Sequence, residues 1–381
     1  SSSAASDVYK RQIQERLKAL RAEMEKRGIT VYVVPTADFH ESEYVGDHFK
    51  ARKFITGFTG SAGTAVITLD EAGLWTDGRY FVQAENQLKD STVTLYRMGE
   101  ESVPTVDEFV KDRLKEGGCL GFDGRVVNGT WGGKLEKIAA EKNVSMHVTE
   151  DLIDLIWEDR PALSKQPLFI LEEKYSGKST ADKIADLRKA MKENGADVHI
   201  LTSLYDIAWL LNIRGNDIDY VPVVLSYLVL NETECIWFLQ EEVVDDKIRA
   251  YLEENHITTK PYDAIYDYVP EIPADAVVLM NRGTVNYRIV NSLDKAIKVV
   301  DKPNPTELMK AVKNKTEVDN TRAAHVKDGV AFTKFMYWLK TNIGKIPMTE
   351  ISASDYLEAR RREQDNLSLI HISEPTRLRC I

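Results

Sequence analysis

Residues 54–83 read FITGFTGSAGTAVITLDEAGLWTDGRYFVQ and contain the clearest secondary-structure signals of the chain. Residues 65–69 are short, apolar and β-branched, which predicts a buried strand. Residues 70–73 supply turn chemistry, and residues 74–76 then predict the returning strand of a hairpin. The stretch therefore predicts a β-hairpin in a core sheet, with the preceding glycines serving as turns.

The glycine-rich loop before this hairpin has an alternative interpretation as a phosphate cradle. Gly57, Gly60 and Gly63 alternate with small hydroxyl residues, as in many phosphate-binding loops. However, the loop lacks the Gly-Lys-Ser/Thr ending of a P-loop, and the strand follows the loop instead of preceding it. We therefore prefer the hairpin.

Composition limits the classes of function. A chain of 381 residues predicts two or three domains, and 43% hydrophobic with 29% charged residues is typical of globular proteins. The net charge of -10 argues against nucleic-acid binding. No apolar run is long enough for a membrane span or a signal-peptide core. Three distant cysteines without a CxxC pair indicate a reducing compartment, so we expect a cytoplasmic location (Cys119, Cys235 and Cys380).

Helices and strands alternate along the first half of the chain, which predicts a layered α/β domain. Residues 13–27 have helical apolar spacing, and Gly28 ends that helix before a strand at residues 30–34. Residues 157–167 interrupt the alternation with two prolines, which indicates a domain boundary. A second boundary is expected at residues 302–305, Lys-Pro-Asn-Pro.

The start of the first domain is repeated in the second half. Residues 187–195 followed by 198–201 match residues 20–28 followed by 31–34, with leucine, arginine, methionine, glycine and valine in register. Each copy predicts a helix that leads into a strand. This repetition predicts a duplicated domain.

Two groups of polar residues could form sites. The first follows the first strand and has no recognised metal-ligand spacing, so we expect a solvated loop and a short helix (His40, Glu41, Glu43, Asp47 and His48). The second lies in the stretch 203–230, for which we predict a helix and then strands at 222–230 and 234–239. Its polar residues are expected to form buried caps and interdomain hydrogen bonds (Asp206, Trp209, Asn212, Arg214, Gly215 and Asp217).

The C-terminal part predicts two further helices. Residues 315–343 place Ala331, Phe335, Trp338 and Leu339 on one stripe of a long amphipathic helix. Thr349 is the expected N-cap of a second helix that runs toward residue 365.

The motifs GFTGSAGTAVIT (57–68) and LWTDGRYFVQA (74–84) closely resemble the N-terminal domain of Xaa-Pro aminopeptidases, the aminopeptidase P group of the creatinase/prolidase superfamily. The likeness includes residues 42–44 and covers most of the chain. It implies an α/β fold with two tandem creatinase/prolidase N-terminal-like domains, each a mixed sheet flanked by helices. The first helices of an incomplete pita-bread catalytic domain are expected to follow.

Both ends of the chain differ from the rest. Residues 2–12 and 367–377 resemble in-frame translations of sequencing adapters. The expected organisation is therefore an adapter-like segment at each end, at 1–12 and 367–381, and three biological segments between them. These are a first domain at 13–160, a second domain at 161–312 and the start of the pita-bread domain at 313–366. His371 and Cys380 are accordingly not expected to be ligands.

The resemblance also implies a chemistry. The family hydrolyses the bond between an N-terminal residue and a following proline, using two divalent ions, usually manganese, held by two Asp, one His and two Glu. We find no such ligand set here, so we expect this chain alone to bind no metal and to be inactive. Proline-containing peptides as substrates and a homodimer of the full-length enzyme are also implied.

One site residue follows from the resemblance: Arg79 of the WTDGRYF motif is expected to bind substrate. The alternative is a structural ion pair between Arg79 and Asp77 or a nearby acid. Two other functions also stay open. The chain could come from another pita-bread hydrolase of the creatinase or prolidase type, or it could be a non-catalytic binding module with the same N-terminal fold.

Overall fold

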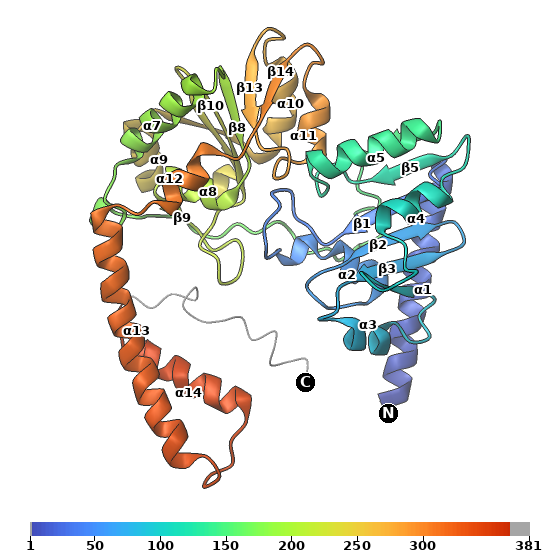
Figure 1. Ribbon diagram of the computed structural model, residues 1–381, viewed down its shortest axis with the longest axis horizontal. Helices are drawn as coiled ribbons and strands as arrows, with labels where there is room; N and C mark the ends of the chain where they lie inside the picture. Colours follow the sequence, from blue (N-terminus) through green and yellow to red (C-terminus); the bar gives the residue numbers. More distant parts are fainter. Residues whose placement is uncertain (1, 366–381) are drawn as a thin grey trace.

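The computed structural model describes residues 2–365, which form two α/β domains followed by C-terminal helices (Figure 1). The adapter-like segment predicted at 367–381, with His371 and Cys380, lies outside the described residues. The adapter-like segment predicted at 2–12 is helical and forms the beginning of α1 (Ser2–Lys26). The origin proposed for both segments stays a prediction.

The first domain contains a six-stranded mixed sheet of order β4-β3-β2-β1-β5-β6. The predicted hairpin is confirmed, because β2 and β3 pair antiparallel with Ala65 opposite Leu74. β1 pairs antiparallel with β2 and parallel with β5 at the centre of the sheet. The strands are β1 (Val31–Pro35), β2 (Thr64–Thr68), β3 (Ala72–Thr76), β4 (Thr94–Arg97), β5 (Cys119–Phe122) and β6 (Ser145–His147).

Helices cover both faces of this sheet. α1, α2 (Ala51–Thr56) and α3 (Phe81–Leu88) share one hydrophobic core, while α4 (Val106–Arg113) and α5 (Gly129–Glu141) share the other. The predicted stripe of α1 is fully buried, because apolar residues three or four positions apart face the sheet together (Ile13, Leu17, Leu20 and Met24). Trp75 of the hairpin stacks on Tyr96 in the opposite core, with ring centroids 4.1 Å apart.

The second domain repeats this topology. Its sheet has the order β12-β11-β10-β8-β13-β14. From one edge to the other, its strand pairs are parallel, antiparallel, antiparallel, parallel and parallel, as in the first sheet. The strands are β8 (Val198–Leu201), β10 (Ser226–Asn231), β11 (Cys235–Leu239), β12 (Ile257–Pro261), β13 (Val277–Met280) and β14 (Lys298–Asp301). Its helices are α6 (Glu173–Ser176), α7 (Thr180–Glu193), α8 (Leu204–Leu210), α9 (Asp246–Glu254), α10 (Ile265–Tyr268) and α11 (Tyr287–Ser292). A short separate pair is formed by β7 (Phe169–Ile170) and β9 (Ile213–Arg214).

Individual contacts confirm that the domain is duplicated. Arg21 on α1 donates from Nε to the carbonyl of Thr68 at 2.9 Å, and Arg188 on α7 donates from Nε to the carbonyl of Asn231 at 3.0 Å. Both acceptors end the strand that pairs with the central one. Gly28 and Gly195 also share a left-handed conformation, with φ of +67° and +64°. The repetition seen in the sequence therefore extends to single hydrogen bonds.

One predicted strand is shorter than expected. β10 begins at Ser226 and not at Pro222. Residues 222–225 are held instead by Asp217, whose amide donates to the Val223 carbonyl at 3.2 Å and whose Oδ2 accepts the Leu225 amide at 2.8 Å. Because proline has no N–H to donate, Pro222 suits this loop better than a sheet ladder.

The two domains meet along α5 and α11, which lie side by side in Figure 1. Four backbone hydrogen bonds of 2.7–3.0 Å cross this junction, among them Gly129 to Val285 and Tyr287 to Val127. Gly132 lies directly under Tyr287, so close that a Cβ on Gly132 would be 2.1 Å from Tyr287 Cδ2. Only a residue without a side chain fits there.

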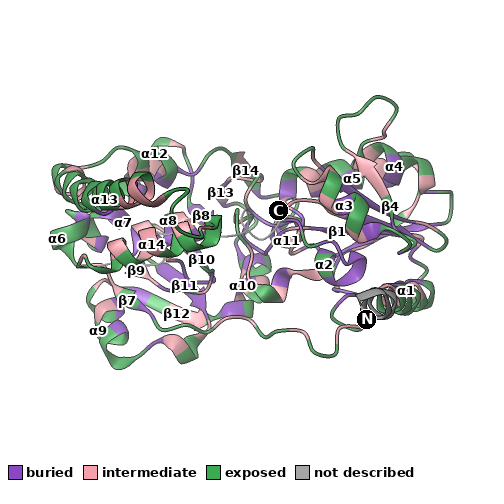
Figure 2. Ribbon diagram, turned by 90° about the horizontal axis from the view of Figure 1, so that it is seen from below, coloured by how far each residue is buried: buried purple, intermediate pink, exposed green. Residues whose placement is uncertain are grey.

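Three helices come after the last strand of the second sheet: α12 (Pro305–Ala311), α13 (Lys315–Asn342) and α14 (Glu350–Arg362). Thr349 accepts the Ser352 amide in a capping box, which confirms the predicted N-cap. The predicted stripe of α13 packs on α14, where Trp338 stacks on Tyr356 with centroids 4.0 Å apart. Figure 2 shows that α13 is otherwise largely exposed, in contrast to the buried strands of both sheets.

No helix within residues 2–365 has the length and apolar character that crossing a bilayer requires.

Candidate functional site

Arg79 lies in the turn after β3, where hydrogen bonds to Asp77 hold its side chain in place. Its Nε donates to Asp77 Oδ1 and its Nη2 to Asp77 Oδ2, both at 2.8 Å, and the Arg79 amide also donates to Oδ1 at 3.1 Å. This pairing raises the pKa of Arg79 and lowers that of Asp77. The side chain is 67% exposed and lies on the surface, so the local ion pair left open by the sequence does form. The role of Arg79 in substrate binding stays a prediction.

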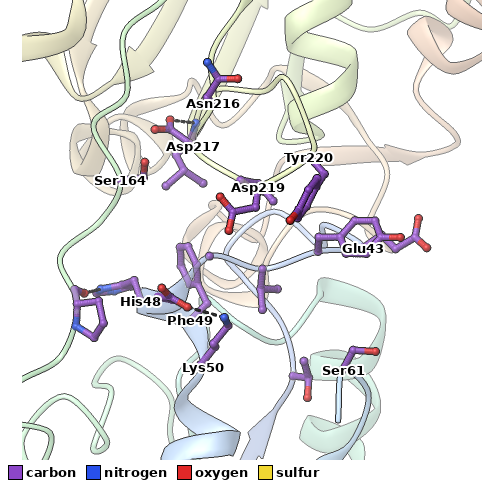
Figure 3. Close-up of a pocket in the computed structure, with 18 of the residues that line it drawn as sticks. Glu43, His48, Phe49, Lys50, Ser61, Ser164, Asn216, Asp217, Asp219 and Tyr220 are labelled. Carbon is purple, nitrogen blue, oxygen red and sulfur yellow. Dashed lines mark hydrogen bonds and ion pairs between the residues drawn. The ribbon is translucent and has the colours of Figure 1, made fainter. Parts of the chain in front are cut away.

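A pocket of about 920 Å³ lies between the two domains. The first domain contributes residues 43–50, α2 and the loop at 59–61, and the second contributes the loop at 216–220. The connecting segment around residues 161–169 closes one side. Figure 3 shows Asp219 and Tyr220 at the tip of the 216–220 loop, facing the segment that carries Phe49 and Lys50. A volume of this size suits a peptide-sized ligand.

Local hydrogen bonds hold the 216–220 loop in place. Asp217 accepts the Gln166 amide at 3.1 Å and the Leu225 amide at 2.8 Å, and burial raises the pKa of this carboxyl. Ile218 and Val221 form a bridge and enter the core of the second domain. Between them, Tyr220 has a φ of +64°, which is rare for a bulky side chain. The buried flanks therefore hold Tyr220 in a strained conformation at the pocket.

Arg52 forms the opposite wall and is only 3% exposed. Its Nε donates to the Thr36 hydroxyl at 2.9 Å, and its two terminal nitrogens donate to the carbonyls of Phe58 and Gly60. Burial lowers the pKa of Arg52 to about 10, so it is still a cation at neutral pH. Arg52 therefore fixes the glycine-rich loop and places a positive charge behind it.

The structure brings together the two polar groups that the sequence singled out separately. Glu43, Asp47 and His48 line the pocket from the first domain, and Asp217 lines it from the second. Arg52, Lys53 and Tyr220 also line it, and no pattern in the sequence marked them as site residues. The signal that could have indicated Arg52 is the cationic run Ala-Arg-Lys before a glycine-rich loop.

The expectation of a solvated loop after β1 is wrong for His40. This side chain is 2% exposed and crosses into the second domain, where Nδ1 lies 3.1 Å from the Thr202 carbonyl and Nε2 lies 2.6 Å from the Tyr262 hydroxyl. The short helix is confirmed at Asp47–Phe49. Within residues 2–365, no group of three or more His, Cys, Asp or Glu side chains could hold a metal ion.

The polar residues around α8 are structural, as expected, but the hydrogen-bond partners that residues 2–365 provide for them lie within residues 161–312, so the predicted interdomain hydrogen bonds do not form there. Asp206 is fully buried and pairs with Lys310 of α12, and Asn304 donates to it at 3.3 Å. Asn212 accepts from the buried Lys183 at 2.6 Å. These bonds tie α7 to α8 within the second domain and fasten α12 to the same helix.

Comparison with known families identifies both domains. The Creatinase/Prolidase N-terminal domain matches residues 16–156, and a second family with the same description matches residues 159–317. The chain is 38% identical to a "Probable Xaa-Pro aminopeptidase P" of Sordaria macrospora, over 92% of this chain and 59% of that protein. It is also 38% identical to a relative of the same name in Neurospora crassa, over 92% of this chain and 53% of that one.

One solved structure has the same arrangement of both domains. The X-prolyl aminopeptidase from Caenorhabditis elegans, described as a cytosolic enzyme with a di-nuclear active site, superposes with a TM-score of 0.87 at 31% identity. The superposition covers 93% of this chain and 60% of that one. The chain thus spans somewhat more than half the length of the relatives it matches.

Proposed function

Because the chain belongs to the creatinase/prolidase family, whose N-terminal domain it carries twice, we propose that it supplies these domains to an Xaa-Pro aminopeptidase. Such an enzyme hydrolyses the bond between an N-terminal residue and a following proline. The observation that carries the proposal is the match to Xaa-Pro aminopeptidases across 92–93% of the chain, which spans both domains and the C-terminal helices.

The metal chemistry of the proposed enzyme would come from outside the described residues. Two divalent ions, which we propose to be manganese, would activate a bridging water in such an enzyme. The described residues contain no group that fits such ions. The two N-terminal domains would instead bind and orient the peptide, with the interdomain pocket and the turn of Arg79 as the candidate surfaces.

Further parts of the proposal concern organisation. We propose the domain boundaries 13–160, 161–312 and 313–366, which the proline-containing segments support. A cytoplasmic location is supported by the description of the C. elegans relative as cytosolic. Proline-containing peptides as substrates and a homodimer complete the proposal, and neither a nucleic acid nor a membrane is included as a partner.

A chimera tests the function directly. Residues 13–317 would be joined to the matching C-terminal part of the Sordaria relative and assayed with manganese. We expect release of the N-terminal residue from Ala-Pro-Ala but not from Ala-Ala-Ala, and no release by residues 1–381 alone. A folded chimera that cleaves neither peptide, or cleaves both equally, would refute the proposal.

Arg79 is tested in the same chimera. We expect Arg79→Ala to lower kcat/KM about tenfold, because a guanidinium fork that binds a carbonyl or carboxylate is lost. Arg79→Lys should recover only part of this loss. The melting temperature should stay unchanged, since the side chain is exposed.

The matched control for Arg79 is Arg97→Ala, which removes a half-buried arginine that is also ion-paired. It should leave kcat/KM unchanged. If Arg79→Ala instead lowers the melting temperature and keeps normal kinetics, Arg79 is structural and the site assignment fails.

A further inference from the structure

The charged side chains of the interdomain pocket divide into two kinds. Some already have partners: Asp47 forms an ion pair with Lys50, and both oxygens of Asp217 accept backbone amides. Others have none. Within the part of the chain that the structure describes, the side chains of Glu43, Asp219 and Lys53 have neither a hydrogen bond nor an ion pair. The pocket therefore contains charges of both signs that have no hydrogen-bonded or ion-paired partner within these residues, although Lys53 is near enough to Asp47 to help lower the pKa of that carboxyl.

Arg52 adds a fourth charge, which is fixed in position. All its hydrogen-bond acceptors among residues 2–365 are neutral oxygens, those of Thr36, Phe58 and Gly60. No carboxylate within that range pairs with this buried guanidinium. Carbonyl dipoles stabilise a buried cation only in part, so an anion arriving nearby would gain from the field of Arg52. Lys53, the next residue on α2, lines the pocket and is exposed to receive such an anion.

Asp219 and the two cations lie on opposite domains. Asp219 is at the tip of the 216–220 loop in the second domain, while Arg52 and Lys53 lie on α2 of the first. Glu43 lines the same pocket from the first domain (Figure 3). A ligand that reaches from the 216–220 loop to α2 would thus meet the carboxylate of Asp219 on one domain and the cations of Arg52 and Lys53 on the other.

The backbone of the loop supports a role in binding. Tyr220 is held at φ +64° by the buried flanking residues Ile218 and Val221, next to the free carboxylate of Asp219. Strain of this kind persists when the surrounding structure enforces it, and it is concentrated at ligand-binding sites. The phenol of Tyr220 presents an apolar ring with a polar end to the pocket, as residues that contact peptides commonly do.

We propose that the interdomain pocket binds a short peptide with free ends, holding its ammonium group at Asp219 and Glu43 and its carboxylate at Lys53, with Arg52 behind. Tyr220 covers the peptide between these ends. That the ligand is a peptide rests on the proposed function. The recognition of both termini is a separate statement and can fail separately.

The test measures binding by calorimetry with residues 1–381 and three probes: Ala-Pro-Ala, its N-acetylated form and its C-terminal amide. Because each charge-assisted contact is strong, we expect either blocked end to weaken binding about tenfold. Asp219→Asn should lower the affinity for the free peptide by a similar factor and leave the affinity for the acetylated peptide unchanged. Lys53→Ala should also lower the affinity for the free peptide about tenfold, and it should leave the affinity for the C-terminal amide unchanged.

Matched controls carry the same changes of charge elsewhere. Glu232→Gln and Lys189→Ala alter exposed residues of the second domain that lie outside the pocket, and they should not change any of the three affinities. Raising the salt concentration should lower the affinity for the free peptide more than the affinity for either blocked peptide, because salt screens the ionic contacts of both charged termini.

The outcomes separate this inference from the proposed function. If Ala-Ala-Ala binds as tightly as Ala-Pro-Ala and loses affinity equally when either end is blocked, the pocket recognises both termini. Only the preference for proline in the proposed function would then be contradicted. Equal affinity for free, acetylated and amidated peptides would overturn the inference. So would the absence of binding at millimolar concentrations, or equal losses in the pocket variants and the controls.

Discussion

Gly132→Ala is expected to lower the free energy of unfolding by about 2–3 kcal/mol, the typical cost of overpacking a filled core. The new Cβ would lie 2.1 Å from Tyr287 Cδ2 and 2.8 Å from Tyr287 Cβ. Tyr287 cannot move away easily, because its amide donates to Val127 at 2.7 Å and its ring packs on Phe122. The two domains must therefore separate at the α5–α11 junction. Urea denaturation followed by tryptophan fluorescence measures the loss.

The neighbouring residue provides the control. Gly133 lies in the same helix, and a Cβ there would meet no atom within 4 Å. Gly133→Ala should raise the free energy of unfolding by roughly 0.5–1 kcal/mol, because alanine is the better helix former. If both variants have the same stability, the contact between Gly132 and Tyr287 does not hold the domains together.

His40 is expected to make the stability of the protein depend on pH between about 4 and 6.5. Nδ1 donates to the Thr202 carbonyl, so Nε2 is free to accept from the Tyr262 hydroxyl and the imidazole is neutral. Burial lowers its pKa to about 4, although the carboxylate of Asp38 opposes this shift. Tyr227, stacked beside the ring at 4.5 Å, is neutral in this range because burial raises its pKa.

Proton binding sets the sign of this dependence. Between these pH values the unfolded chain binds a proton at His40 and the folded chain does not, so the free energy of unfolding falls as the pH falls. A difference from 6.5 to about 4 corresponds to a loss of up to about 3 kcal/mol. Urea denaturation at pH 7.5, 6, 5 and 4.5 measures this slope.

His40→Gln isolates the contribution of His40. The variant should lose about 2–3 kcal/mol at pH 7.5, because the Tyr262 hydroxyl loses its partner, and its slope below pH 6.5 should be shallower than that of the unchanged protein. Burial also lowers the pKa of His199 and His48. Both residues are present in the variant and in the unchanged protein, so their contributions cancel when the two pH slopes are compared. His325→Gln, at an exposed position on α13, should keep the original slope. Equal slopes for His40→Gln and the unchanged protein would contradict this account.

The elements of both sheets could be predicted because their signals are local. The β-branched run of the central hairpin, the turn before its second strand and the Gly28 helix end each depend on a few adjacent residues. The duplication was visible for the same reason, since equal local patterns form equal elements. Pro222 was assigned to a strand in error, because the hydrogen bonds of Asp217 that hold residues 222–225 in a loop are not visible as a pattern.

The candidate site depended on contacts between distant residues. His40 and Tyr262 are 222 positions apart, and His40 is buried because the second domain packs against it, whereas Glu41, Glu43 and Asp47 of the same polar cluster are exposed as expected. The pocket has the same origin, because Arg52 and Asp219 face one cavity only when the two sheets are docked through α5 and α11. The ion pair of Arg79 is a local contact instead. Its partner Asp77 is two residues away, and the sequence therefore indicated this pair as an alternative.

Two copies of one α/β domain follow from the order of residues alone, because strand, turn and helix signals act over a few residues. Which polar side chains are buried, which are paired and which face a common pocket follows instead from the packing of the whole chain. Burial and pairing depend on the position of every neighbour in space, and the order of residues along the chain does not specify that position locally.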